Sequence, residues 1–189
     1  MSDHHDDYEF ERGYWGNCCN TFDEEQKHYI YAKYMGIQRS HYSFILPENS
    51  RILDIGGGPC SMLLKTKNLE YGLVVDPIQY PHWTMLRYGE MNIAYDVKPG
   101  EEVDKTGFDE VWIYNCMQHA IDPAKIIENA KRAAPRLRIF EWVDIPAHDG
   151  HPHMLTEEAL NSWIGQKGKV AVLGEWGCYG KAYFGSFEF

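Results

Sequence analysis

The sequence predicts a single α/β domain, a three-layer sandwich in which helices cover both faces of a mostly parallel, seven-stranded sheet. Three observations lead to this prediction. Strand-like and helical segments alternate along the 189 residues, as in parallel sheets with right-handed crossovers. A glycine triplet, Gly56-Gly57-Gly58, stops the first buried strand. The last two strand-like segments are joined by a glycine-containing turn, which is typical of an antiparallel hairpin.

The N-terminal residues 1–22 are predicted to form a segment apart from the domain, which comprises residues 23–189. The first seven residues are acidic and polar, unlike a signal peptide, and we interpret them as a disordered tail. The rest of the segment is aromatic and predicted to be irregular. Its residues Tyr14 and Trp15 either fold over a ligand site or extend the core.

The remaining elements follow from periodicity, capping residues and turn residues. A helix is predicted to begin at Asp23, with Gln26 placed as in a capping box, and to end at Gly36. Asp122 is predicted to cap a later helix whose first residue is Pro123. The further predicted helices span 62–65, 123–134 and 156–163, and the predicted strands span 51–55, 71–76, 92–95, 109–115, 137–143, 170–173 and 182–189.

The charge balance argues against a polyanionic partner. The chain has 28 acidic and 18 basic residues, a formal net charge of −10. Nucleic-acid binding needs a basic surface, and the basic cluster between Lys131 and Arg138 is short, so we expect no nucleic-acid partner. No apolar run reaches the roughly 18 residues of a membrane span. The five cysteines suit reduced thiols, and we expect a cytoplasmic protein.

The turn after the first strand has the composition of a cofactor site. Asp54 precedes the glycines, which let a backbone approach a ligand closely. Asp76 ends the second strand 22 residues later (76 − 54), where a carboxylate can bind both hydroxyls of a ribose. A dinucleotide turn needs a third glycine beside the pyrophosphate, but Ser61 stands there and Pro59 interrupts the turn. Asp54 would repel a pyrophosphate and attract the ammonium and sulfonium of S-adenosylmethionine (SAM), so the charges favour SAM.

These residues also carry a resemblance to a known family. Residues 52–59, with the sequence ILDIGGGP, resemble the first motif of the class I (Rossmann-like) SAM-dependent methyltransferases. Further similarity lies at Asp76, at 107–112 before the fourth strand, at 115–123 after it, and in the terminal hairpin. The resemblance covers about residues 48–189 and implies the same fold, SAM as cofactor and methyl transfer as activity.

The resemblance implies a role for each part of the cofactor site. Asp54 and the glycine backbone would hold the methionine part, Asp76 the ribose, an acid after the third strand the adenine, and residues after the fourth strand the methyl side. Cys60 departs from the family's commonest pattern, which has a third glycine there. The implied cofactor-binding residues are Asp54, Gly56, Gly57, Gly58, Pro59, Asp76, Pro77, Glu101, Glu102, Asn115 and Cys116.

Methyl transfer needs mainly alignment, with a base where the acceptor loses a proton. The candidate catalytic residues are His119, Glu141, His151 and His153, which lie beyond the fourth and fifth strands. His119 either acts on the acceptor or packs structurally. The histidine-rich run 148–153, which includes Asp149, either forms an active-site lid, binds a metal or lies on the surface, and we assign no metal.

The sequence therefore predicts a SAM-dependent methyltransferase with a small-molecule acceptor. The alternative is a noncatalytic SAM-binding regulator with the same fold. A nicotinamide-dependent oxidoreductase is disfavoured by Ser61 and by the terminal hairpin. The Asn-Pro-Pro-Tyr motif of amino methylases of bases is absent after the fourth strand. The identity of the acceptor, the atom that is methylated and the oligomeric state stay open.

Overall fold

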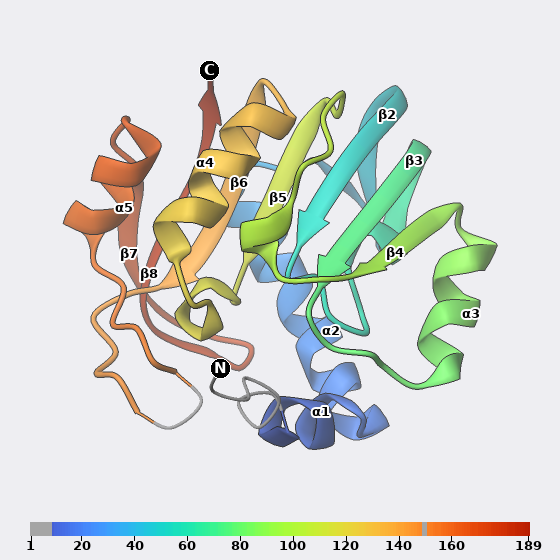
Figure 1. Cartoon of the computed structure of the whole chain (residues 1–189), viewed down its shortest axis with the longest axis horizontal. Coiled ribbons are helices and arrows are strands. Elements are labelled where there is room, and N and C mark those ends of the chain that lie inside the picture. The colour runs from blue at the N-terminus through green and yellow to red at the C-terminus, as the bar shows by residue number, and fades with distance from the viewer. Residues whose placement is uncertain (1–8, 149–150) are drawn as a thin grey trace.

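Eight strands form one twisted sheet within the described part of the chain. The computed structural model describes residues 9–148 and 151–189, and Figure 1 shows helices on both sides of the sheet. The strands are β1 (Arg39–Ser40), β2 (Ser43–Ile55), β3 (Thr66–Asp76), β4 (Ile93–Val97), β5 (Glu110–Tyr114), β6 (Arg136–Trp142), β7 (Lys169–Glu175) and β8 (Cys178–Glu188). Their order is β4-β3-β2-β5-β6-β8-β7, with β1 paired to β2 outside this path.

The sheet is parallel in its centre and antiparallel at one edge. Strands β2 to β6 pair in parallel, whereas β8 runs antiparallel to both β6 and β7. The predicted seven-stranded sheet with a terminal hairpin is confirmed, and the two-residue β1 is an addition to it. The strand order reverses between β2 and β5, and in open α/β sheets ligands bind at the carboxyl ends of such strands.

Two strands begin earlier than predicted. β2 begins at Ser43 and β3 at Thr66, and their extensions pair with each other before a register shift at Ser50. The turn-forming residues 47–49 interrupt the apolar pattern, so the sequence does not predict that these extensions pair. A strand is stabilised by its neighbour as well as by its own propensity. The hairpin is also tighter than predicted, since Glu175 pairs with Cys178.

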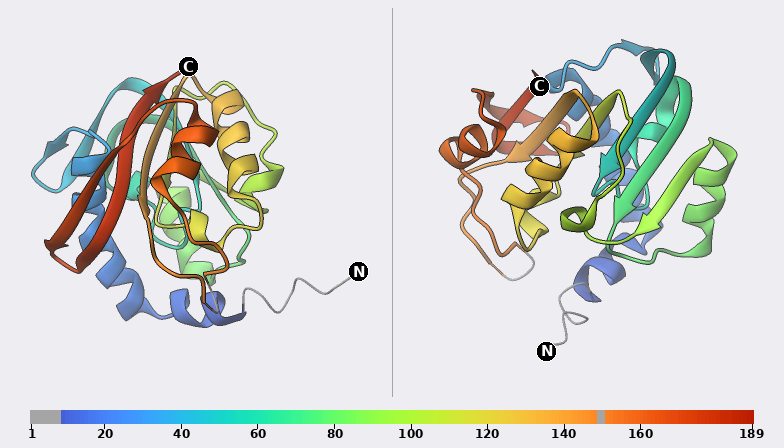
Figure 2. Two further views of the ribbon diagram at one scale, coloured as in Figure 1. Left: turned by 90° about the vertical axis from the view of Figure 1, so that its left-hand side faces the viewer. Right: turned by 45° about the horizontal axis from the view of Figure 1, so that its top comes forward.

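Helices cover the two faces of the sheet as predicted for a three-layer sandwich. The α-helices are α1 (Glu9–Trp15), α2 (Cys18–Tyr34), α3 (His82–Glu90), α4 (Pro123–Ala133) and α5 (Glu157–Ile164), and short 3₁₀ helices are η1 (Met62–Lys65), η2 (Gly100–Glu102) and η3 (Met117–His119). Helices α4 and α5 pack on one buried cluster, and α2 and α3 on the other (Figure 2). None of these helices combines the length and the apolar character that crossing a bilayer requires.

The N-terminal helices correct the sequence interpretation. Within the segment 8–22 that was predicted to be irregular, the described residues 9–22 contain α1 and the start of α2, and α2 begins at Cys18 rather than at Asp23. Asn17 is the capping residue, and its side chain accepts a hydrogen bond from the amide of Cys19 at 2.8 Å. The acids that favour a helix start at Asp23 lie inside the helix instead. The stop at Gly36 is confirmed, because α2 ends at Tyr34 and Gly36 has a φ of +71°.

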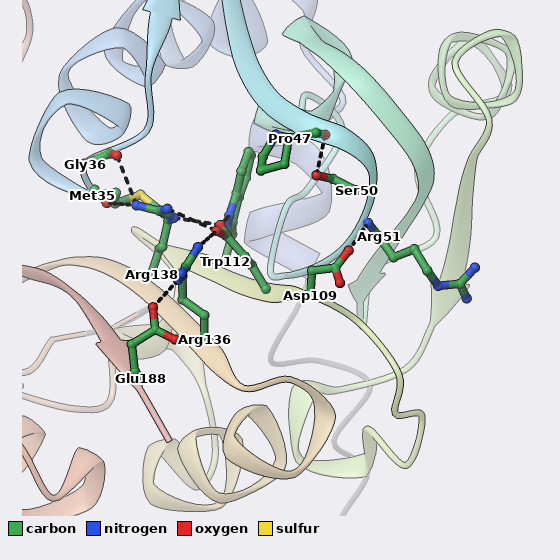
Figure 3. Close-up of polar contacts among 11 residues, drawn as sticks. Met35, Gly36, Pro47, Ser50, Arg51, Asp109, Trp112, Arg136, Arg138 and Glu188 are labelled. Atoms are coloured by element: carbon green, nitrogen blue, oxygen red, sulfur yellow. Dashed lines mark hydrogen bonds and ion pairs between the residues drawn. The ribbon is translucent and has the colours of Figure 1, made fainter.

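A buried ion network at the amino ends of β5 and β6 fastens α2 to the sheet (Figure 3). Glu110 accepts hydrogen bonds from Arg138 at 2.6 Å and from Arg136 at 2.7 Å. Burial opposes the ionisation of Glu110, but hydrogen bonds from these arginines and from a tryptophan outweigh it and lower the pKa. Arg138 also donates to the carbonyls of Met35 and Gly36 at the end of α2. Arg136 and Arg138, which belong to the basic cluster seen in the sequence, therefore make contacts within the protein.

Candidate functional site

A cavity opens at the carboxyl ends of β2, β3 and β5, and residues of α1 and α2 line it from the other side. It holds about 830 Å³ of empty space including its mouth, which suits a nucleoside-sized ligand. Its remaining walls come from the turn after β2, the segments after β3 and β5, and η2. This is the position at which open α/β sheets bind their ligands.

The glycine turn presents bare backbone to the cavity. Gly56, Gly57 and Gly58 all line it, and Gly56 and Gly58 have φ values of +76° and +59°. L side chains rarely adopt this region. A Cβ on Gly56 would lie 2.5 Å from the Cys116 side chain, and one on Gly57 would lie 2.6 Å from the Oδ2 of Asp54. Both positions therefore require glycine on steric grounds.

Asp54 lies beneath this turn rather than on the cavity wall. It is fully buried, and its Oδ2 accepts hydrogen bonds from the hydroxyls of Ser61 at 2.5 Å and Tyr114 at 2.6 Å. Its Oδ1 has no hydrogen-bond partner among the residues that the structure describes. Burial raises the pKa of Asp54 to about 7. The structure thus places an unsatisfied carboxylate oxygen below the glycine backbone.

Asp76 reaches the cavity wall at the end of β3. Its Oδ2 accepts a hydrogen bond from the amide of Gly58 at 3.1 Å, and its Oδ1 accepts one from the amide of Ile78 at 3.0 Å. Burial raises the pKa of Asp76 to about 7 despite these hydrogen bonds. Pro59 and Pro77 also line the cavity. A carboxylate held in this way can accept further hydrogen bonds from the hydroxyls of a ligand.

Glu101 and Glu102 have different surroundings. Glu101, in η2, lines the cavity, and its Oε1 accepts hydrogen bonds from the amides of Ile121 and Asp122, each at 2.9 Å. Glu102 is exposed and does not belong to the cavity lining. Glu101 therefore ties η2 to the segment that precedes α4, and of the two acids it is the one beside the cavity.

Asn115 and Cys116 line the cavity where β5 ends. Asn115 has a φ of +50°, and its side chain donates to Glu24 of α2 at 3.1 Å. The Oε1 of Glu141 accepts hydrogen bonds from the amides of Cys116 at 3.1 Å and Met117 at 3.2 Å. Glu141 is fully buried, does not line the cavity, and has a pKa raised by burial to about 8. Glu141 thus holds the backbone of the wall from behind.

His119 lines the cavity and contacts the histidine-rich loop. Its Nδ1 lies 3.4 Å from the Oε1 of Glu11, and its ring packs edge-on against His151 with centroids 4.4 Å apart. Burial and the neighbouring His119 and His148 lower the pKa of His151 to about 4, so this ring is neutral near pH 7. The loop therefore packs on a cavity residue, which favours the lid interpretation over a plain surface loop.

His148, His151 and His153 lie outside the cavity lining. His148 and His151 form an isolated antiparallel bridge, with ring centroids 4.3 Å apart. The Nε2 of His153 lies 3.1 Å from the carbonyl of Ile121. Asp149 falls outside the described residues. Within 9–148 and 151–189, no group of histidine, cysteine or acidic side chains has the arrangement of a metal site.

Several residues of the cavity lining were not predicted as site residues from the sequence. They include Glu11, Trp15, Glu24, His28 and Tyr80. Glu24 and His28 are four residues apart on α2 and therefore share one face of that helix. This spacing of two polar residues beside apolar positions is the sequence feature that could have indicated that both face a site. Trp15 lines the cavity, which supports the covering role weighed for the aromatic segment, whereas Tyr14 is 43% exposed.

Comparison with known proteins gives matches among solved structures alone. No family model matches the sequence, and no curated protein matches it. The N-methyltransferase NodS from Bradyrhizobium japonicum, solved with S-adenosylhomocysteine (SAH), has a TM-score of 0.64 at 13% identity, over 96% of this chain and 97% of that one. A SAM-dependent methyltransferase from Thermotoga maritima, described as a possible histamine N-methyltransferase, has a TM-score of 0.62 at 13% identity, over 94% and 98%.

A third similar structure is larger than this chain. A protein from Anabaena variabilis, described as a methyltransferase from an antibiotic biosynthesis pathway, has a TM-score of 0.52 at 12% identity. The match covers 68% of this chain and spans 60% of the length of that protein. The chain has the class I methyltransferase fold. At these identities the likeness shows the fold, and the function is argued from the site.

Proposed function

We propose that the protein binds SAM in this cavity and transfers its methyl group to a small-molecule acceptor. The observation that carries the proposal is the meeting of the glycine turn and Asp76. The amide of Gly58 donates to the Asp76 carboxylate at 3.1 Å, and both residues line the same cavity. Bare backbone and a carboxylate at the ends of two adjacent strands suit a cofactor that carries a ribose.

The charges of the cavity fit SAM. Its lining, as far as the described residues form it, has the acids Glu11, Glu24, Asp76 and Glu101 and contains no lysine or arginine. SAM carries an ammonium and a sulfonium, so this lining attracts it and disfavours a pyrophosphate. When bound, SAM supplies a methyl group already activated by the sulfonium.

The residues present can be assigned to parts of this cofactor. The backbone of 56–58 would hold the methionine part, and Asp54 would stabilise positive charge from below. Asp76 would bind the ribose, and Glu101 would lie on the adenine side. Pro59 and Pro77 would pack against the cofactor, and Asn115 and Cys116 would line the methyl side. The steric need for glycine at 56 and 57 agrees with a ligand lying against the backbone there.

The cover of the cavity supports a small acceptor. Trp15 of α1 and His28 of α2 line the cavity, and the loop that carries His151 packs on His119. The described residues 9–22 would therefore cover the cavity of the predicted domain 23–189, with α2 continuing across the boundary at residue 23. His119 would face the acceptor, His151 and His153 would fix the loop, and the buried Glu141 would position the Cys116 backbone.

Calorimetry tests the cofactor assignment. The purified protein is titrated with SAM, with SAH and with NADH, and we expect binding of the first two alone. D76N should weaken SAM binding at least tenfold, because an amide replaces an acceptor of ribose hydroxyls. D104N is the matched control, since Asp104 is exposed and does not line the cavity. Absence of SAM binding, or equal effects of both variants, would contradict the proposal.

Turnover separates the enzyme from a noncatalytic SAM-binding protein. Formation of SAH from SAM is followed with a panel of small amines, alcohols, thiols and carboxylates. SAH that depends on an acceptor supports the enzyme. SAM binding with no SAH formed on any acceptor class favours the noncatalytic alternative.

A further inference from the structure

Helix α2 contributes a buried polar pair to the cavity beyond the residues assigned to the cofactor. Glu24 is 6% exposed and His28 is 1% exposed, and both line the cavity. A buried carboxylate and a buried imidazole cost solvation free energy unless a partner compensates. Their contacts therefore indicate what the cavity is built to receive.

Glu24 is held firmly by its neighbours. Its Oε1 accepts hydrogen bonds from the hydroxyl of Tyr31 at 2.9 Å and from Asn115 at 3.1 Å, and its Oε2 pairs with Lys27 at 2.9 Å. Lys27 itself does not line the cavity. The carboxylate is thus presented to the cavity in one orientation, with lone-pair sites left for a donor from a ligand.

His28 lacks the partners that Glu24 has. No hydrogen bond in the described part of the chain reaches its ring, and its Nδ1 is buried without a partner. Burial, with Lys65, Arg87 and Lys27 nearby, lowers its pKa well below the usual value, so the ring is neutral. A neutral imidazole has one nitrogen that accepts a hydrogen bond. Because buried polar groups are as a rule hydrogen-bonded, this unpaired ring nitrogen beside the cavity is consistent with a partner that enters the cavity.

We infer that Glu24, His28 and Asn115 form the acceptor subsite and that the acceptor is a small amine. The inference rests on the proposed function and specifies its substrate class. The Glu24 carboxylate attracts a cationic amine and stabilises the cationic product, while the imidazole accepts an N–H hydrogen bond. A carboxylate or phosphate acceptor would meet four acidic side chains and no basic one in the described lining.

The chemistry balances without another reactant. The amine reacts in its neutral form, after losing a proton to solvent. Its lone pair forms the new N–C bond with the methyl carbon, the C–S bond breaks, and the electron pair stays on sulfur to give SAH. The methylated nitrogen carries the positive charge, and the product leaves as an ammonium ion.

Matched probes test this subsite in the protein saturated with SAH. Methylamine, propylamine and benzylamine are titrated by calorimetry beside acetate, butyrate and benzoate, which match them in size. We expect at least one amine to bind at least tenfold more tightly than its matching carboxylate. E24Q and H28F should each weaken the binding of that amine at least tenfold, and H28F should leave SAH affinity within twofold.

The control is E25Q, the same change one residue along α2. Glu25 pairs with Arg87 at 2.7 Å and does not line the cavity, so amine binding should be unchanged. Thermal unfolding confirms that each variant is folded, and H28F provides an independent readout from E24Q. SAH binding without any amine preference, or equal effects of E24Q and E25Q, overturns the subsite alone. Absence of SAH binding instead contradicts the proposed function.

Discussion

Glu141 on β6 holds the backbone amide of Cys116 through one carboxylate oxygen, with the two atoms 3.1 Å apart. The same oxygen accepts the amide of Met117, while the other has no hydrogen-bond partner in the described structure. Because the side chain is fully buried, its charged form is disfavoured and burial raises the pKa to about 8. The cavity wall thus rests on a group whose protonation changes near neutral pH.

We predict that Glu141 makes the stability of the protein fall as pH rises. Its pKa is raised in the folded state, so its stabilising contribution is complete below the ordinary value of 4.5 and is lost as pH rises towards about 8. In urea unfolding between pH 5 and 8.5, the wild type should lose about 1 kcal/mol or more relative to E141Q, which mimics the neutral acid. Parallel curves for the two proteins would refute this, and E128Q, at an exposed site, is the control.

We predict that G56A weakens cofactor binding. The added Cβ would lie 2.5 Å from Cys116, and the φ of +76° disfavours any L side chain. SAM affinity should fall at least tenfold, and the free energy of unfolding should fall by about 1–3 kcal/mol. G174A is the control, because a Cβ there meets no atom within 4 Å. Calorimetry and urea unfolding measure both quantities, and SAM affinity as in the wild type would contradict the assigned turn.

We predict that SAM affinity rises with pH through about 7. The Asp76 carboxyl has a pKa raised to about 7 by burial, and its ionised form is the better acceptor for ribose hydroxyls. Protons therefore compete with the cofactor, and Kd should decrease between pH 6 and 8. In D76N this contribution disappears, and the pH dependence of Kd should be shallower. The same pH profile in both proteins would exclude Asp76 as its source.

We predict that E110Q destabilises the fold and spares the cofactor site. Removing the Glu110 carboxylate leaves the largely buried Arg138 without an acidic partner, which costs about 3 kcal/mol, whereas Arg136 keeps its ion pair with Glu188. The pair lies at the amino ends of β5 and β6, and none of its residues lines the cavity. The midpoint of urea unfolding should fall, while SAM affinity of the folded protein stays within twofold. E128Q, an exposed acid, should leave both unchanged.

The elements that could be predicted are those with local signals. Asp122 caps α4 and accepts the amide of Lys125 at 3.0 Å, as its position before Pro123 indicated. The glycine turn and Asp76 also lie where the ends of the predicted strands put them. Such features depend on residues a few positions apart, so the sequence displays them directly.

The start of α2 shows the limit of these local signals. Asp23 and the acids that follow it favour a helix start at that position. The capping residue is instead Asn17, six residues earlier, whose extended backbone and side-chain hydrogen bond begin the helix there. Alternative capping residues on one continuous helix differ in free energy by about 1 kcal/mol. The packing of the helix on the sheet contributes more than this and therefore decides where the helix begins.

The sequence by itself determined the α/β class, the terminal hairpin, and the glycine turn with its second acid. The tertiary structure alone decided which polar side chains face the cavity. Glu24 meets Asn115 across 91 positions of the chain, whereas Glu141, a candidate base, is buried behind the wall. Propensity and periodicity act over a few residues, but burial and side-chain pairing arise only when distant segments pack together. For that reason the cavity wall that α2 contributes exists only when α2 packs over the sheet.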